Sequence, residues 1–295
     1  MRAMPVLVTG AERALGAATV AALAATGGQV RAYVDPRRAT PGVLATLRAR
    51  GCKVARGTLD DEGRLELALA QVHTVVHAAV EPLAAPAAAL DGVATALSAA
   101  IGAGCRRFVA VLPFAGGAPD GNPYLEALAE AEQLLADAPL ETVALRCALP
   151  YGAGDPLVLA LAGGAADAYR ELAAARHAPV YVDDVAAAVA AADAARDEPG
   201  DLAMVLRLAG PERVTLAAFG RLLGAPAGRL RARLSWLRGD VPVLPDHVVD
   251  LLARGEPPGP VTRTATRPAA GAARLRAAAR EEERLAAAAA REPAR

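Results

Sequence analysis

Short apolar runs alternate with longer helical patterns over the first 150 residues of the chain. The runs are rich in β-branched residues and contain few polar ones, which is typical of strands buried on both faces of a parallel sheet. The longer segments carry apolar residues at helical spacing. Strands are predicted over residues 6–8, 29–34, 53–56, 74–78, 108–112 and 142–147. Helices are predicted over residues 14–25, 41–50, 62–70, 86–103 and 124–136.

This order of elements predicts an α/β fold, a Rossmann-type doubly wound parallel sheet with a small C-terminal substrate lobe. Strands that alternate with helices at this spacing are joined by right-handed crossovers. The rhythm loosens beyond Pro150, where late strands are predicted over 180–182 and 203–208. Further helices are predicted over 184–195, with Asp184 as the N-cap, and over 216–223.

Residues 1–261 are predicted to form one domain of this kind, with the small lobe built mainly from 151–176 and 210–261. From residue 262 the composition changes to alanine, arginine and glutamate with few large apolar side chains. Residues 262–295 are therefore predicted to be a helical or disordered tail.

Composition excludes several classes of function. The 32 basic residues balance the 32 acidic ones, so the chain lacks the long-range attraction needed to bind nucleic acid or an anionic membrane surface. No uncharged apolar run reaches the roughly 18 residues of a membrane span. The cysteines are three and far apart, which favours free thiols in a reducing compartment. We therefore expect a cytoplasmic protein that binds no metal, nucleic acid or membrane.

The segment VLVTGAERALG joins the first strand to the first helix and predicts a pyrophosphate-binding turn. Gly10 and Gly16 take its first and last glycine positions. The middle position falls on Ala14 in one spacing, next to Leu15, and on Arg13 in the other. Alanine adds only one methyl group near the phosphates, which favours the first spacing. The alternative is a strand-to-helix turn that no longer binds a nucleotide.

The end of the second predicted strand bears on the choice between NAD and NADP. Asp35 lies there, and a carboxylate in that place accepts hydrogen bonds from the adenosine ribose of NAD. Arg37 and Arg38 follow at once, and Arg13 lies in the glycine turn. A guanidinium suits the 2′-phosphate of NADP. Three arginines against one aspartate lean slightly to NADP, and a solvated loop is the alternative role of Arg37 and Arg38.

The order of motifs resembles the short-chain dehydrogenase/reductase superfamily, in the extended or atypical branch that includes nucleotide-sugar epimerases and dehydratases. RGTLDD resembles the segment in which an aspartate approaches the adenine, with Thr58 in place of the aspartate and Leu59 beside it. VVHAAV resembles the strand end that lines the cofactor, which implies a cofactor contact for His77, Ala78 and Ala79. The segments LRCALPYGAGDP, VYVDDVAAAV and GPERVTLAAFGRLL resemble later landmarks of the family.

The catalytic residues that the resemblance implies are incomplete. The family uses a tyrosine as acid/base, a lysine four residues later that lowers the tyrosine pKa, and a serine or threonine. Tyr124 matches the tyrosine, but Leu128 stands at the lysine position and Pro113 near the serine position. The only lysine of the chain is Lys53. His77, or Glu81 beyond it, could replace a lost group near the nicotinamide, although for His77 a partly buried ring bonded to backbone is favoured.

Two functions therefore remain open. One is an oxidoreductase or epimerase that binds NAD(P) and acts on a small metabolite with a non-standard proton donor. The other is a catalytically inactive nucleotide-binding sensor or scaffold. The resemblance also implies a homodimer, formed through the helices predicted over 86–103 and 124–136.

Overall fold

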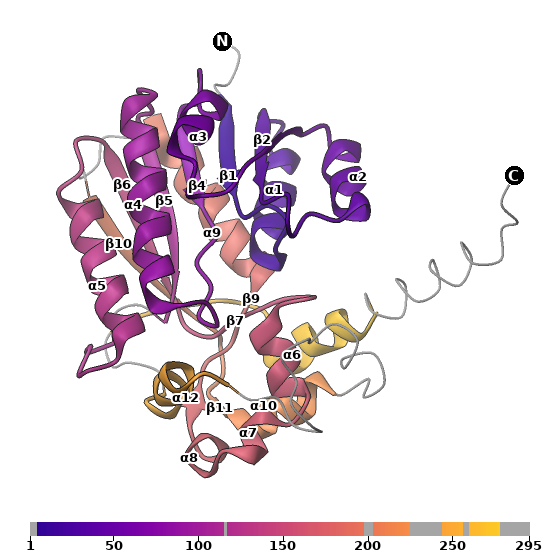
Figure 1. Ribbon diagram of the computed structural model, residues 1–295. Helices are drawn as coiled ribbons and strands as arrows, with labels where there is room; N and C mark the ends of the chain where they lie inside the picture. The colour runs from indigo at the N-terminus through magenta and orange to yellow at the C-terminus, as the bar shows by residue number, and fades with distance from the viewer. Residues whose placement is uncertain (1–4, 115–116, 198–202, 225–243, 256–259, 278–295) are drawn as a thin grey trace, which may run out of the picture.

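A parallel sheet of eight strands forms the centre of the computed structural model, which describes residues 5–114, 117–197, 203–224, 244–255 and 260–277 (Figure 1). The strand order is β12-β10-β6-β5-β4-β1-β2-β3. Chain order reverses at β1, which pairs with β2 on one side and with β4 on the other. The strands are β1 (Val6–Thr9), β2 (Val30–Val34), β3 (Lys53–Arg56), β4 (Thr74–His77), β5 (Arg107–Pro113), β6 (Glu141–Cys147), β10 (Ala203–Ala209) and β12 (Thr262–Arg263).

Helices cover both faces of this sheet, as Figure 1 shows. Because side chains alternate along a strand, Phe108 and Leu112 of β5 face one hydrophobic cluster while Val109 and Val111 face the other. The first face carries α3 (Glu62–Ala68), α4 (Pro86–Gly102) and α5 (Pro123–Ala136). The second carries α1 (Ala14–Ala25), α2 (Pro41–Ala49) and α9 (Val182–Ala194). The predicted doubly wound α/β fold is confirmed.

A smaller lobe lies beyond the carboxyl ends of the central strands (Figure 1). Its hydrophobic residues, among them Leu161 and Phe219, belong to the same cluster as those beneath α4 and α5. Its helices are α6 (Pro156–Ala162), α7 (Ala165–Ala168), α8 (Arg170–Ala173), α10 (Leu216–Leu223) and α12 (Asp246–Ala253). Its strand pairs are β8 (Arg176–His177) with β11 (Val214–Thr215) and β7 (Pro150–Tyr151) with β9 (Val180–Tyr181), and η1 (Ala195–Asp197) follows α9.

The described part of the chain after residue 261 packs on this folded body and includes a helix, and the predicted division of the chain at residue 261 remains a prediction. Strand β12 pairs in parallel with the end of β10. Residues 268–277 are helical, and Ala272 is fully buried. Residues 278–295 of the predicted tail and 225–243 of the predicted lobe lie outside the described residues.

The predicted capping role of Asp184 is wrong. Helix α9 begins at Val182, with Tyr181 as its N-cap and without a side-chain cap. The carboxylate of Asp184 instead accepts hydrogen bonds from the backbone N and the Oγ1 of Thr266, each at 2.9 Å. Because the helix begins two residues earlier, Asp184 lies within its first turn and not at the N-cap. Its carboxylate bonds to the buried Thr266 instead.

In the described part of the chain no helix is long and apolar enough to cross a bilayer. Within the same residues, no three His, Cys, Asp or Glu side chains gather in a way that could hold a metal ion. The cysteines at 52, 105 and 147 are buried and form no disulfide. The predictions of a cytoplasmic location and of a homodimer remain predictions.

Candidate functional site

The turn after β1 depends on its two glycines for backbone packing. Gly10 has a φ of +67°, and a Cβ atom there would lie 2.9 Å from the Cα of Ala79. A Cβ atom at Gly16 would lie 2.1 Å from the carbonyl oxygen of Gly10. Since no Cβ fits at either distance, the fold itself requires both glycines. Their presence therefore does not by itself indicate a ligand.

The middle of the turn carries the features that suit an anion. Arg13 is the N-cap of α1, and no side chain caps this helix. Its first-turn N–H groups thus lack the usual side-chain acceptor, at the positive end of a helix of 12 residues. The methyl group of Ala14 faces Gly152, where an added Cβ would lie 2.9 Å from it, and Leu15 is half-buried behind the turn.

Asp35, at the end of β2, is held by its neighbours. Arg37 donates from Nε and Nη2 to both carboxylate oxygens at 2.9–3.2 Å, and this hydrogen bonding holds the Asp35 pKa below its usual value. The backbone N of Asp35 donates to the Glu12 carboxylate at 3.3 Å. The carboxylate expected to favour NAD and an arginine expected to favour NADP thus form one ion pair, which leaves neither feature to decide between the cofactors.

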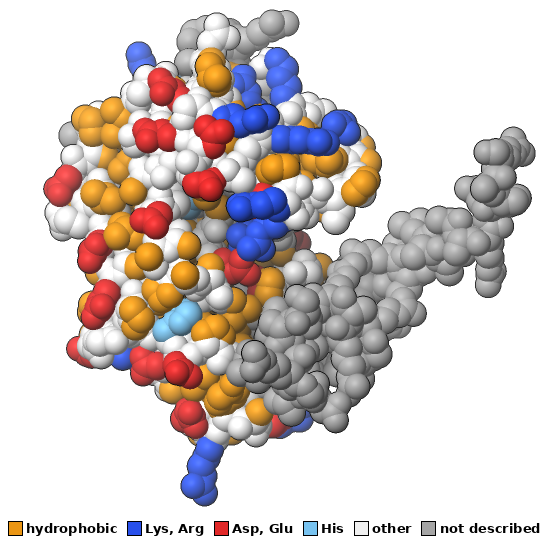
Figure 2. All heavy atoms as spheres, viewed as in Figure 1, with side chains coloured by type: hydrophobic (Ala, Val, Ile, Leu, Met, Phe, Trp, Pro, Cys, Tyr) orange, Lys and Arg blue, Asp and Glu red, His pale blue; other side chains and the backbone are white. Residues whose placement is uncertain are grey.

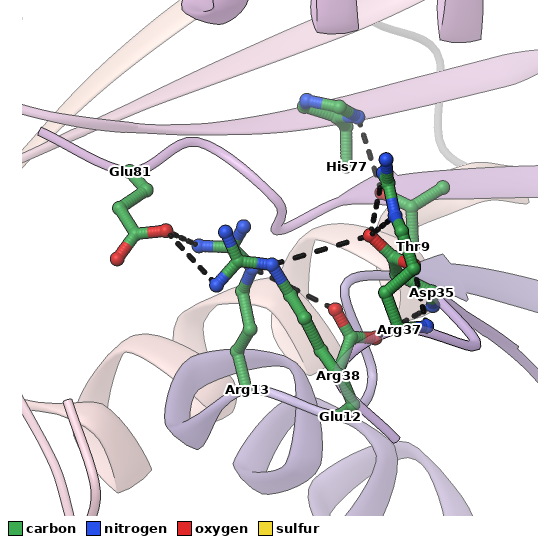
Figure 3. Close-up of polar contacts among 8 residues, drawn as sticks. All are labelled: Thr9, Glu12, Arg13, Asp35, Arg37, Arg38, His77 and Glu81. Atoms are coloured by element: carbon green, nitrogen blue, oxygen red, sulfur yellow. Dashed lines mark hydrogen bonds and ion pairs between the residues drawn. The ribbon is translucent and has the colours of Figure 1, made fainter. Parts of the chain in front are cut away.

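Glu81, in the loop after β4, joins this loop to the loops that follow β1 and β2. Its Oε2 atom lies 2.5 Å from Nη1 of Arg13 and 3.5 Å from Nη1 of Arg38. Figure 3 shows both guanidinium groups converging on that carboxylate. The sequence predicts for Glu81 only a place near the nicotinamide, beside His77. Its partners could not be found, because 68 positions separate it from Arg13.

The strand end at His77 is closed off. Its ring is 1% exposed, and Nδ1 is 3.1 Å from Oγ1 of Thr9, so the favoured picture of a partly buried ring bonded to backbone is corrected. Burial, and to a smaller extent the nearby Arg13 charge, lower the His77 pKa to about 3, so the ring is neutral. Ala78 and Ala79 lie beside Gly10 of the glycine turn, and their contact with a cofactor remains a prediction.

The segment after β3 also contacts its neighbours rather than an open site. The backbone oxygen of Thr58 accepts a hydrogen bond from the Tyr33 hydroxyl at 3.1 Å. Leu59 packs near Gly92, where an added Cβ would lie 3.5 Å from its side chain. The structure thus brings Gly10, Arg13, Asp35 and Ala79 together at the carboxyl end of β1, and the predicted cofactor contacts of Thr58 and Leu59 remain predictions.

Tyr124 is sealed from solvent at the start of α5. Its side chain is 0% exposed, and its hydroxyl donates a hydrogen bond to the Pro113 carbonyl oxygen at 3.3 Å. Burial raises the Tyr124 pKa, and the nearby Glu81 carboxylate raises it further. Leu128 is 1% exposed, so an apolar side chain fills the position of the expected cation. Among the described residues no group lowers the pKa of this phenol. A lowered pKa is the condition for proton exchange by a tyrosine at neutral pH.

Helix α12 provides the seal. The His247 ring stacks on Tyr124 at a centroid distance of 6.4 Å, and its Nε2 lies 3.0 Å from the Pro82 carbonyl oxygen. Asn122 donates to the Asp250 carboxylate at 2.7 Å. The helix therefore bridges the start of α5 and the loop after β4. This contact could not be predicted, since the residues lie more than 120 positions apart.

Asp155 is a further carboxylate near Glu81 and Arg13. It caps α6 by accepting hydrogen bonds from the N–H groups of Leu157 and Val158. Loss of solvation raises the Asp155 pKa to about 6 against these two hydrogen bonds, and the Glu81 carboxylate adds to the rise. The sequence analysis missed it, although an Asp-Pro pair before an apolar segment is a signal for a capped helix start.

A separate cavity of about 190 Å³ lies at the carboxyl ends of β5, β6 and β10. Its basic side chains include Arg146, which pairs with Glu132 at 2.6 Å, and Arg254, which pairs with Asp250 at 2.8 Å. These ion pairs reduce the attraction that Arg146 and Arg254 offer to an anion in the cavity, which Arg207 also lines.

Solved structures of sugar epimerases share this architecture. A UDP-glucose 4-epimerase from Stenotrophomonas maltophila, with bound NAD and formylated UDP-arabinopyranose, superposes with a TM-score of 0.66 at 18% identity over 96% of this chain and 99% of that one. A nucleoside-diphosphate-sugar epimerase from Staphylococcus aureus superposes with a TM-score of 0.65 at 16% identity, over 91% of this chain and 99% of that one. A UDP-glucose 4-epimerase from Thermotoga maritima, with UDP-glucose, superposes with a TM-score of 0.58 at 21% identity, over 82% of this chain and 86% of that one.

The chain has the fold of the extended short-chain dehydrogenases/reductases. No protein-family model matches the sequence, and no curated protein matches it. At these identities the likeness concerns the fold, and the chemistry has to be argued from the residues.

Proposed function

We propose that the protein binds a nicotinamide dinucleotide at the crevice beside β1 and does not carry out tyrosine-dependent epimerase chemistry. The sealed Tyr124 carries the second half of this proposal. A phenol that is 0% exposed, bonded to a backbone carbonyl and faced by Leu128 has no route to a substrate and no cation to acidify it. The protein then acts as a nucleotide-binding sensor or scaffold.

The crevice supports the first half. An uncapped helix start, the guanidinium of Arg13 and the Asp35 carboxylate lie where a dinucleotide's diphosphate and ribose cross a doubly wound sheet. Moreover, Nε of Arg13 is buried and has no hydrogen-bond partner among the described residues. Several of the solved structures with this fold hold NAD, among them those from Stenotrophomonas maltophila and Brucella ovis. These observations favour a nicotinamide dinucleotide and leave the choice between NAD and NADP to experiment.

Calorimetric titration with NAD, NADH, NADP and NADPH tests the binding. We expect micromolar affinity for at least one oxidised and reduced pair. Absence of binding by all four would contradict the proposal and leave a turn that keeps its glycines for backbone packing alone. A parallel assay follows cofactor absorbance with a panel of carbonyl compounds, and turnover in that assay would contradict the inactive assignment.

A second candidate is an enzyme that acts on a small metabolite with another proton donor. One observation favours it: the carboxyl of Asp155, with its pKa raised to about 6 beside Glu81, has the proton affinity of an acid/base group working near neutral pH. If turnover is found, Asp155→Asn should abolish it, whereas Tyr124→Phe should not. The reverse result would return the catalytic role to Tyr124.

A further inference from the structure

Three loops meet where the order of the sheet reverses. Arg13 follows β1, Arg38 follows β2 and Glu81 follows β4, and these three strands are neighbours in the order β4-β1-β2. In doubly wound sheets this reversal opens the crevice in which ligands bind. The two ion pairs of Glu81, with Arg13 and with Arg38, join these three loops (Figure 3).

The bridge is only partly solvated. The Glu81 side chain is 11% exposed and that of Arg13 is 25% exposed, so water screens their attraction less than it screens a surface pair. On this face of the molecule, basic side chains gather toward α1 and α2 while acidic ones lie mainly over α3, α4 and α5 (Figure 2). Glu81 thus places an anion among guanidinium groups that would otherwise face the crevice.

A diphosphate would bind to the same groups as the Glu81 carboxylate. Guanidinium groups bind phosphate and carboxylate oxygens with similar geometry, and both anions are favoured near a helix N-terminus. Nε of Arg13 is buried and has no hydrogen-bond partner in the part of the chain that the structure describes, and the Glu12 carboxylate lies 3.7 Å from it. The Nε donor of Arg13 therefore has no acceptor among the described residues, while its Nη1 donates to Glu81.

We propose that Glu81 is an internal competitor for the diphosphate: Arg13 and Arg38 form a two-guanidinium diphosphate site, and Glu81 must release them when a nucleotide binds. This rests on the proposed dinucleotide binding and adds its regulation. Affinity for the nucleotide is reduced by the fraction of molecules in which the bridge is closed. Conditions or partners that draw Glu81 away raise the affinity.

Glu81→Gln tests the competition, because it removes the charge and keeps the shape. We expect its dissociation constant for the bound nicotinamide dinucleotide, measured by calorimetry, to fall about fivefold or more. Glu130→Gln is the matched control, since it removes one negative charge from an exposed position on α5. The control should leave the constant nearly unchanged. Thermal unfolding of both variants checks that each is folded.

A double-mutant comparison shows whether Glu81 acts through the two arginines. In an Arg13→Gln, Arg38→Gln background, binding should weaken and Glu81→Gln should no longer tighten it. Unchanged or weaker binding by Glu81→Gln, with the wild type binding normally, overturns the competition but leaves the proposed function intact. A complete lack of binding by wild type and Glu81→Gln alike overturns both.

Discussion

The side-chain amide of Asn122 lies 2.7 Å from the Oδ2 atom of Asp250 and so joins the start of α5 to α12. The same residue is 1% exposed and caps α5, its Oδ1 accepting hydrogen bonds from the N–H groups of Tyr124 and Leu125. One buried side chain therefore fixes both the helix that carries Tyr124 and the helix that covers it.

Asn122→Ala should lower the free energy of unfolding by about 2–3 kcal/mol, through loss of the cap and of the bond to Asp250. Urea denaturation measures this change. Asn122→Asp keeps the cap but places two carboxylates together, so it should fall between wild type and Asn122→Ala near pH 4 and lose that advantage near pH 7. A loss below about 0.5 kcal/mol for Asn122→Ala would contradict the linking role.

Introducing at position 128 the lysine that the family resemblance implies should destabilise the protein. Leu128 is 1% exposed, and Leu128→Lys would bury an ammonium group without a partner, at a cost of about 3 kcal/mol in the free energy of unfolding. Leu128→Met, a swap of similar volume, should cost less than about 1.5 kcal/mol. Equal unfolding midpoints for the two variants would show that the position is more open than the structure indicates.

Asp155 should make stability depend on pH in a defined direction. Its folded pKa of about 6 exceeds the ordinary value of 3.8 for an aspartate, so between these values the folded chain holds a proton that the unfolded chain has released. The resulting stability is fully present below pH 3.8 and is lost as pH rises through about 6. Relative to Asp155→Asn, the wild type should lose about 2 kcal/mol across that window.

Asp250 provides the comparison of opposite sign. Hydrogen bonds from Asn122 and Arg254 hold its pKa below the usual value. Its contribution is present above pH 3.8 and disappears as pH falls, so Asp250→Asn should approach wild-type stability in acid. Parallel pH profiles for the variants at 155 and 250 would contradict both assignments.

Most of the central sheet could be predicted because its strands are short apolar runs between glycine and proline signals. β6, for example, was placed within one residue. The lobe and its contacts could not be predicted, because they depend on pairs such as Asp184 with Thr266, which lie 82 positions apart. The same holds for the candidate site. The glycines at 10 and 16 predict the turn from local sequence, whereas the ion pair of Arg13 with Glu81 joins residues 68 positions apart and has no local sequence signal.

The C-terminal segment gives a further prediction. A chain ending at residue 261 should be less stable to heat than one ending at residue 277, by several degrees. The shorter chain lacks β12, the buried Ala272 and the hydrogen bonds of Thr266. Thr266→Val in the full chain is the finer test and should lower the free energy of unfolding by about 1 kcal/mol. Identical melting of the two truncated chains would place the domain boundary at 261 after all.

The late entry of β12 also bears on synthesis in the cell. Leu208 and Ala209 of β10 pair with Thr262 and Arg263, so the carboxyl end of this sheet edge is paired only after the intervening lobe has been translated. Met204 and Val205, earlier in β10, are 42% and 52% exposed in the folded chain. A ribosome-bound chain that ends before residue 262 therefore leaves the end of an apolar edge strand unpaired, which is a template for pairing with other chains. A chaperone that covers nascent β10 would serve this protein most during the interval between translation of residues 209 and 262.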